Sequence, residues 1–224
     1  MSNIIFKLQP FNQAIGRLTT IRDLIRFAVS NFQKHQLYFG HGTDNAYDEA
    51  VYLILYTLHL PLDQLEPYFD AKLVDDEINL VLKVLQTRIL QRIPAPYITH
   101  EAHFLGYSFY VDERVIIPRS YIGEILVSGA LEPWIEHQEL VHDVLDLCTG
   151  NGSLAIIAAD YFIDAQIVAS DISADVIDVA RKNVEKYDLQ DRVTLQQSDL
   201  FTAFKKRKFD LILTNPPYVD KLRM

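Results

Sequence analysis

The sequence is poor in several features that would assign it to a specialised class of protein. Its 224 residues include a single cysteine, Cys148, so an internal disulfide is excluded, and no group of residues has the spacing of a zinc site. The longest apolar runs are far shorter than the ~20 residues that a membrane helix needs. The N-terminus lacks the pattern of a signal peptide. These absences favour a cytoplasmic protein with no membrane association, built from one large or two modest domains.

Basic charge is also scarce. The chain has 21 Lys and Arg against 30 Asp and Glu, so its net charge is −9 and its pI about 5.2. Proteins that grip nucleic-acid phosphates need a basic surface, and no basic recognition segment stands out. The charge balance therefore disfavours a nucleic-acid partner and suits a basic protein partner better.

The first part of the chain, residues 1–93, has the periodicity of helices. Apolar residues fall on one face at helical spacing in three successive segments. The first begins after the N-cap Thr20, the second after Asp44 or Asn45, and the third at Asp75 or Asp76, ending at Ile93 before a proline. This pattern predicts a small N-terminal helical domain rather than a catalytic site.

A linker follows in residues 94–120, where the period changes. Residues 94–97 contain two prolines and predict a stiff linker. Segments 102–105 and 108–111 alternate about Gly106-Tyr107 and predict a β-hairpin. Residues 115–117 predict a short extended piece, and Ser120 is a candidate cap for a helix over 121–131. The boundary between the domains is expected within 94–120, with the hairpin as the joint.

The third part, residues 121–224, alternates apolar strands with helices. Strands are expected at 143–148, 166–170, 193–197 and 209–213, and helices over 152–161 and from Ser173 to about Tyr187. Alternation of this kind predicts an α/β fold with a parallel, doubly wound sheet.

Polar or glycine residues follow every one of these strands, and parallel sheets bind ligands at that edge. Gly150 and Gly152 follow the first strand and would let the backbone approach a ligand closely. Asp171, after the second strand, can accept both hydroxyls of a ribose. Asp199, after the third, can accept an adenine amine. Together these residues predict a site for an adenosine.

Two cofactors that contain adenosine fit the segment with Gly150 and Gly152 after the first strand, which we call the glycine loop. Gly150-x-Gly152-x-x-Ala155 also matches the dinucleotide fingerprint, so the loop alone does not exclude NAD. Asp146 favours a cofactor that carries a cationic sulfonium over NAD. An acid inside an apolar strand beside the ligand suits such a cation and would repel the pyrophosphate of NAD. A motif after the fourth strand is a second discriminator, since hydride transfer does not need it.

That motif is Asn215-Pro216-Pro217-Tyr218. The two prolines restrict the backbone to extended geometry, so the segment at the strand end is rigid. The Asn215 side-chain oxygen and a nearby backbone carbonyl, that of Pro216, can then accept the two hydrogens of a planar –NH₂ group. Tyr218 can stack on the same plane. The motif therefore predicts a site for a conjugated amino or amide group.

With these features, the sequence resembles the class I (Rossmann-like) S-adenosylmethionine-dependent methyltransferases, and among them the protein-(glutamine-N5) methyltransferases. The resemblance covers the whole chain. It implies that a glutamine amide is the methyl acceptor, that S-adenosylhomocysteine is the product, and that the helical domain helps to dock a protein substrate. It implies that the target amide is bound by Asn215, Pro216, Pro217 and Tyr218. It implies that the cofactor is bound by Asp146, Cys148, Thr149, Gly150, Asn151, Gly152, Asp171, Ile172, Asp199, Leu200 and Asn215.

Two further pieces of sequence separate branches of that family. Asp112-Glu113-Arg114-Val115 and Pro118-Arg119-Ser120 resemble the members that methylate large-subunit ribosomal protein three more than those that methylate release factors. Arg119 is expected either over the cofactor or substrate entrance or in a surface salt bridge.

The sequence leaves three other functions open. They are methylation of release factors, N6-methylation of adenine in nucleic acid, and non-catalytic binding of a ribosomal protein through residues 1–93. Family members continue beyond the Asn-Pro-Pro-Tyr motif, so the resemblance also implies a domain that is incomplete at its C-terminus, with its fourth strand at a sheet edge.

Overall fold

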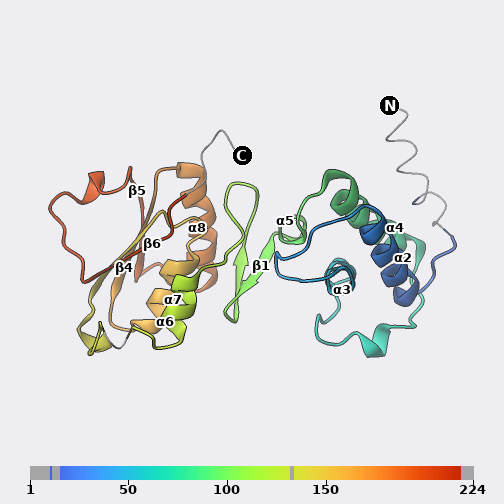
Figure 1. The fold of residues 1–224 in the computed structure, drawn as a ribbon, viewed down its shortest axis with the longest axis horizontal. Coiled ribbons are helices and arrows are strands. Elements are labelled where there is room, and N and C mark those ends of the chain that lie inside the picture. The colour runs from blue at the N-terminus through green and yellow to red at the C-terminus, as the bar shows by residue number, and fades with distance from the viewer. Residues whose placement is uncertain (1–10, 12–15, 132–133, 218–224) are drawn as a thin grey trace. The chain divides into compact units, whose positions relative to one another are not determined.

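A computed structural model of the chain describes residues 11, 16–131 and 134–217. The chain divides into two compact units, Met1–His100 and Glu101–Met224. The first runs from blue to green and the second from green to red in Figure 1. The β-hairpin therefore belongs to the second unit.

The first unit is helical, as its periodicity predicts. Its elements are α2 (Ile21–Lys34), α3 (Ala46–Thr57), the 3₁₀ turn η1 (Glu66–Tyr68), α4 (Asp75–Gln86), the π-helical turn η2 (Thr87–Gln91) and α5 (Ala95–Thr99). Apolar faces of α2, α3 and α4 share one core with the segments between them. No helix in the described part of the chain is long and apolar enough to span a membrane.

Local chemistry fixes where these helices begin. Thr20 caps α2 in a capping box with Asp23, as expected. Asn45, the second of the two candidates, caps α3 by accepting hydrogen bonds from two backbone N–H groups. The helix that starts at Asp75 passes into a π turn before it ends, with Arg92 in the left-handed region at φ 58°.

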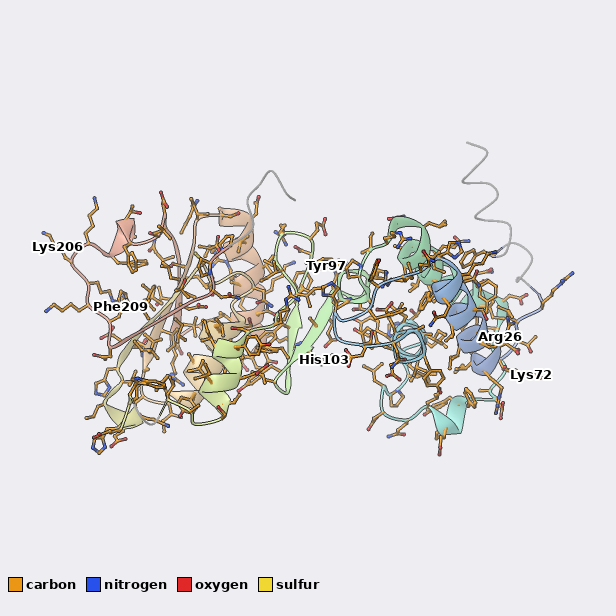
Figure 2. The ribbon with its side chains drawn as sticks, in the orientation of Figure 1. Arg26, Lys72, Tyr97, His103, Lys206 and Phe209 are labelled. Carbon is orange, nitrogen blue, oxygen red and sulfur yellow. The ribbon has the colours of Figure 1, made fainter. Side chains whose placement is uncertain are left out.

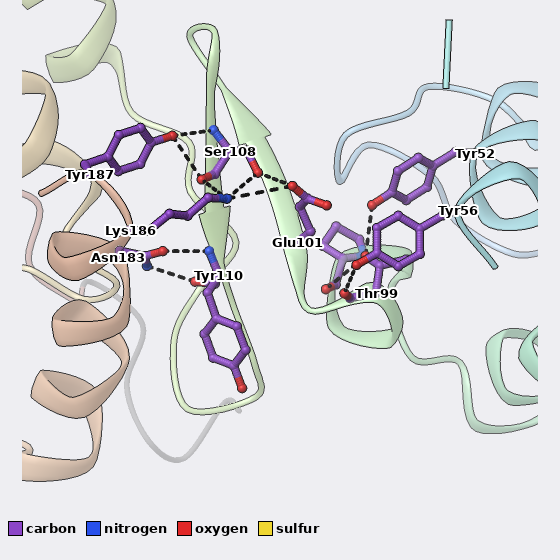
Figure 3. A network of polar contacts seen from close by, with 10 residues as sticks. Tyr52, Tyr56, Thr99, Glu101, Ser108, Tyr110, Asn183, Lys186 and Tyr187 are labelled. Carbon is purple, nitrogen blue, oxygen red and sulfur yellow. Dashed lines mark hydrogen bonds and ion pairs between the residues drawn. The ribbon is translucent and has the colours of Figure 1, made fainter. Parts of the chain in front are cut away.

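The prediction of a stiff linker at residues 94–97 is wrong, because this segment enters helix α5. Prolines are tolerated there, since the first N–H groups of a helix have no partner inside it. The helix is held within its own unit by two tyrosines of α3 (Figure 3). Tyr52 shares a hydrogen bond with the Thr99 hydroxyl, and the Tyr56 hydroxyl donates to the Thr99 carbonyl, at 2.9 and 2.8 Å.

The second unit opens with the predicted hairpin. Its strands are β1 (Glu101–Phe104) and β2 (Tyr107–Tyr110), one residue earlier than expected, and Leu105 and Gly106 turn with φ of 51° and 84°. Helix α6 (Tyr121–Val127) begins after its cap, Ser120, and is shorter than predicted. The extended piece expected at 115–117 pairs with no strand in the described structure.

The rest of this unit is the predicted βαβ array. It consists of the 3₁₀ turn η3 (Gln138–Leu140), β3 (Asp143–Leu147), α7 (Ser153–Tyr161), β4 (Gln166–Asp171), α8 (Ala174–Lys186), β5 (Val193–Gln197), the 3₁₀ turn η4 (Thr202–Phe204) and β6 (Leu211–Thr214). The four strands are parallel in the order β5-β4-β3-β6. The predicted α/β fold with a parallel sheet is confirmed.

The sheet has an apolar layer on each face. The larger layer contains Val144, Ile167 and the inward residues of α7, together with Phe109 of the hairpin. The smaller contains Leu145 and Val168 with Phe204. The chain moves outward from β3 through β4 to β5 and then returns to form β6 on the other side of β3. The strand order therefore switches beside β3. Open parallel sheets bind ligands at such a switch point.

Candidate active site

Pairing of the strands brings their carboxyl ends to one edge of the sheet. Leu147 of β3 lies opposite Ser170 of β4 on one side and opposite Thr214 of β6 on the other. The segments that start at Cys148 and at Asn215 therefore leave the sheet as neighbours. The Thr214 hydroxyl reinforces this junction by donating to the Leu147 carbonyl at 2.9 Å.

The loop after β3 is shaped by left-handed backbone conformations. Cys148, Gly150 and Gly152 have φ of 62°, 58° and 83°. A Cβ on Gly150 would meet nothing within 4 Å, so the space beside it is open, whereas a Cβ on Gly152 would lie 3.3 Å from the Cβ of Ala180. Gly150 thus leaves room for a ligand and Gly152 allows the loop to pack closely on α8.

Asp146 lies beneath this loop and is completely buried. Its Oδ2 accepts a hydrogen bond from the Thr149 hydroxyl at 2.5 Å, while its Oδ1 has no partner among the described residues. Burial raises the pKa of the Asp146 carboxyl to about 6, although the hydrogen bond from Thr149 opposes the shift. One carboxylate oxygen therefore holds the loop, and the other remains available to a cation.

Asp171 ends β4 and holds the same loop from the other side. Its Oδ2 accepts the Gly150 N–H at 3.2 Å and its Oδ1 accepts the Ser173 N–H at 3.1 Å. The side chain is half-buried, and each oxygen retains a free lone pair. Those lone pairs suit a pair of neighbouring hydroxyl groups such as those of a ribose.

Two more buried polar atoms at this edge have no partner in the described part of the chain. They are Nδ2 of Asn151, in the loop, and Oγ of Ser170, at the end of β4. Buried polar groups in proteins are almost always hydrogen-bonded, so unpaired ones beside an open loop indicate that a ligand completes them. Together with the Asp146 oxygen and the space beside Gly150, they fit S-adenosylmethionine, which carries an ammonium, a sulfonium and polar groups on a ribose.

The remaining cofactor residues named from the sequence are more exposed. Ile172 and Leu200 are 64% and 53% exposed, and Asp199 is exposed at the start of the turn after β5. The Ser198 hydroxyl donates to the carbonyl of Leu200, which adopts a left-handed φ of 44°. These residues lie after β4 and β5, at the edge where a nucleoside would extend from the loop.

The motif after β6 is described as far as Pro217. Asn215 is half-buried and Pro216 and Pro217 are exposed. Tyr218, expected to stack on the target amide, lies outside the described residues. Since Asn215 directly follows Thr214, it stands next to the glycine loop rather than on a distant strand.

Sequence reasoning missed a basic run, Lys205-Lys206-Arg207-Lys208, when it found no basic recognition segment. All four residues are exposed, and Lys206 extends outward in Figure 2. The run lies at the opposite edge of the sheet, because Arg207 pairs with the first residue of β3, Asp143, at 2.8 Å and packs on Phe209. It is therefore not placed to present a nucleic-acid base to Asn215.

Two other features of this unit were open questions. Arg119 is exposed ahead of α6 and forms no ion pair with a described residue. No cluster of His, Cys, Asp and Glu that could hold a metal ion is found in the described ranges.

Comparison with known proteins adds close relatives. The family model of the methyltransferase small domain matches residues 128–224. The ribosomal protein uL3 glutamine methyltransferase of Neisseria gonorrhoeae is 58% identical over 210 residues, which cover 94% of this chain and 70% of that protein. The enzyme of the same name from Burkholderia pseudomallei is 52% identical, over 90% of this chain and 67% of that one.

Solved structures resemble part of the chain. A T. thermophilus 16S rRNA N2 methyltransferase in complex with AdoMet and guanosine matches with a TM-score of 0.44 and 26% identity, covering 54% of this chain and 33% of that chain. An Agrobacterium tumefaciens SAM-dependent methyltransferase matches with a TM-score of 0.40 and 21% identity, covering 52% of this chain and 39% of that chain.

Proposed function

Because this chain belongs to the family of ribosomal protein uL3 glutamine methyltransferases, we propose that it transfers a methyl group from S-adenosylmethionine to the side-chain nitrogen of one glutamine of uL3. It is an S-adenosylmethionine-dependent methyltransferase that modifies a ribosomal protein. The roles proposed for individual residues rest on one observation, the pairing of Leu147 with Thr214 in the sheet, because this pairing brings Asn215 beside the glycine loop.

When bound, S-adenosylmethionine supplies an electrophilic methyl group on a positively charged sulfur. A glutamine amide is a poor nucleophile, since its lone pair is delocalised into the carbonyl group. We assign to Asn215 Oδ1 and the Pro216 carbonyl the task of accepting the two amide hydrogens, which directs the nitrogen toward the methyl group. Positioning of this kind can supply about 7–11 kcal/mol of a barrier. The nitrogen–carbon bond forms as the carbon–sulfur bond breaks, and the proton lost from nitrogen passes to water.

We assign the cofactor to the loop and strand ends around β3. Asp146 would face the cationic end, Asp171 the ribose, and Asp199 the adenine amine, while Gly150 would leave space for the ligand. Cys148, Thr149, Asn151, Gly152, Ile172 and Leu200 complete the proposed cofactor set together with Asn215, which is assigned to the target amide as well.

The substrate protein is proposed to dock on the first unit, which contains no residue of this site. A basic ribosomal protein would be attracted by a chain with a net charge of −9. Modification of a ribosomal protein also favours a cytoplasmic location. Release factors are the alternative protein substrate.

The test is mass spectrometry of purified uL3 after incubation with this protein and S-adenosylmethionine. We expect a gain of one methyl group on one glutamine. The Asn215→Ala variant should lose at least about 100-fold in turnover while its affinity for the cofactor stays within a few-fold. Ile212→Ala, on the exposed side of the same strand, is the matched control and should keep its turnover.

Turnover of Asn215→Ala close to that of the unmodified protein would disprove the role assigned to Asn215. Methylation of a release factor in place of uL3 would keep the chemistry and change the substrate. Methylation of adenine in nucleic acid, without any gain on either protein, would overturn the proposed function.

A further inference from the structure

Helix α8 carries a fully buried polar residue, Asn183, which belongs neither to the glycine loop nor to the Asn-Pro-Pro-Tyr motif. The helix is amphipathic and covers the sheet with apolar residues, so an amide at 0% exposure needs hydrogen-bond partners. Asn183 has three. Its Oδ1 accepts the Tyr110 N–H at 2.6 Å, and its Nδ2 donates to the Tyr110 carbonyl at 3.0 Å and to the Asn151 carbonyl at 2.8 Å.

These partners lie on two different elements. Tyr110 is the last residue of β2 in the hairpin, and Asn151 is in the glycine loop between Gly150 and Gly152. Both hydrogens of the Asn183 amide are used, one for each element (Figure 3 shows the contacts with Tyr110). One side chain therefore fastens the hairpin and the cofactor loop to the same point on α8.

The glycine loop also meets α8 one turn earlier. A Cβ on Gly152 would be 3.3 Å from the Cβ of Ala180, so loop and helix are in close contact there. Ala180 thus supports Gly152 from below, and Asn183 fixes the adjacent peptide group by its carbonyl oxygen. With Asp171 holding Gly150 N–H on the other side, the loop is restrained at three successive residues.

The hairpin has other contacts with α8 that do not involve the loop. The Tyr187 hydroxyl accepts the Ser108 N–H at 2.9 Å and donates to the Ser108 carbonyl at 3.0 Å, and Lys186 donates to the same carbonyl at 2.8 Å (Figure 3). Tyr187 is thus a natural comparison for Asn183, because both residues give the hairpin two hydrogen bonds and only Asn183 also contacts the loop.

From this arrangement we propose that Asn183 is a positioning residue for S-adenosylmethionine, which holds the glycine loop in its binding conformation and couples that loop to the hairpin. The inference rests on the assignment of the cofactor to the glycine loop. A loop held in advance loses less conformational freedom when the ligand binds, so the affinity is higher. Because coupling is reciprocal, a cofactor that orders the loop also strengthens the hydrogen bonds of Asn183 with Tyr110.

The first experiment compares cofactor affinity in variants by isothermal titration calorimetry. Asn183→Asp keeps the size of the side chain and the acceptor for Tyr110 N–H, but loses both donors and faces two carbonyl oxygens with a carboxylate. We expect its Kd for S-adenosylmethionine to rise at least tenfold. Tyr187→Phe removes both hydrogen bonds to Ser108 while keeping the ring, and we expect its Kd to stay within twofold.

The second experiment needs no substitution and measures hydrogen exchange of the unmodified protein with and without S-adenosylmethionine. We expect the cofactor to slow exchange in residues 149–152 and also at the Tyr110 amide, which donates directly to Asn183. The Ser108 amide, bonded to Tyr187, is the internal control and should change less.

Protection of the loop with an unchanged Tyr110 amide would overturn the coupling. A Kd of Asn183→Asp within twofold of the unmodified protein, or an equal loss in Tyr187→Phe, would overturn the positioning role. If the unmodified protein does not bind the cofactor at all, the proposed function fails together with this inference, and that result is distinct from both of the others.

Discussion

Replacing Asp146 with asparagine should change the pH dependence of stability in a way that the structure specifies. The carboxyl is completely buried, and burial raises its pKa from 3.8 to about 6. When the pKa of a group is higher in the folded than in the unfolded protein, the group stabilises the fold at pH values below its pKa in the unfolded state. This stabilisation is lost as the pH rises through about 6. At about 1.4 kcal/mol per pKa unit, the ionised form costs the folded protein up to about 3 kcal/mol at neutral pH.

The asparagine side chain is neutral at every pH, so the Asp146→Asn variant should escape this cost. We expect the stability of the variant relative to the unmodified protein to increase by about 2 kcal/mol between pH 4 and pH 7, measured by urea unfolding in steps of half a unit. Asp164→Asn, which changes an exposed carboxylate in the turn between α7 and β4, is the control for the loss of one negative charge. A constant difference for Asp146→Asn would refute the assignment of the pKa shift to burial of Asp146.

Cofactor binding gives the same substitution a second, opposite effect. If Oδ1 of Asp146 faces the cationic end of S-adenosylmethionine, the variant should lose affinity even though its fold is more stable at neutral pH. The positive sulfur is neutral in S-adenosylhomocysteine, so we expect a loss on the order of tenfold for the substrate and a smaller loss for the product. Equal losses for the two ligands would show that Asp146 does not act on the charge of the sulfonium.

Three further predictions concern the loop and the helical unit. Burial and the nearby carboxylates raise the pKa of the Cys148 thiol, so alkylation by iodoacetamide at pH 8 should be slower than for a free thiol, as measured by mass spectrometry, and slower again with cofactor. Gly152→Ala should destabilise the fold by about 1–2 kcal/mol in urea unfolding, because of its positive φ and its contact with Ala180. Arg88→Met should cost about 3–5 kcal/mol by leaving the buried carboxylate of Glu49 without its ion pair, and adding Glu49→Leu should restore part of that loss.

The elements of this fold were predictable wherever one periodicity ran without interruption. The strands of the parallel sheet and helix α8 lie within two residues of their predicted bounds, because apolar strands and an amphipathic helix have different periods. The segment of residues 94–99 was not predictable in this way. Its prolines suggested an extended linker, but a π turn and a short helix place them where no N–H is required.

The candidate site was predictable only in its parts. The sequence placed glycines and acids at the ends of separate strands, and any parallel sheet brings such ends to one edge. It did not specify that β6 lies next to β3, since that order depends on the return of the chain across the sheet. The register between Leu147 and Thr214 is therefore the structural fact that joins the cofactor loop to Asn215.

Asp146 and Asn183 show why some functional residues can be found from the sequence and others cannot. Both are completely buried. Asp146 interrupts an apolar strand, where an acid has no ordinary role, so the pattern itself indicates a special environment. Asn183 lies in a helix that has many polar residues, and one more polar side chain breaks no pattern. Its importance comes from its three partners, which belong to segments 32 and 73 residues away, and only the packing of those segments on α8 makes the amide indispensable there.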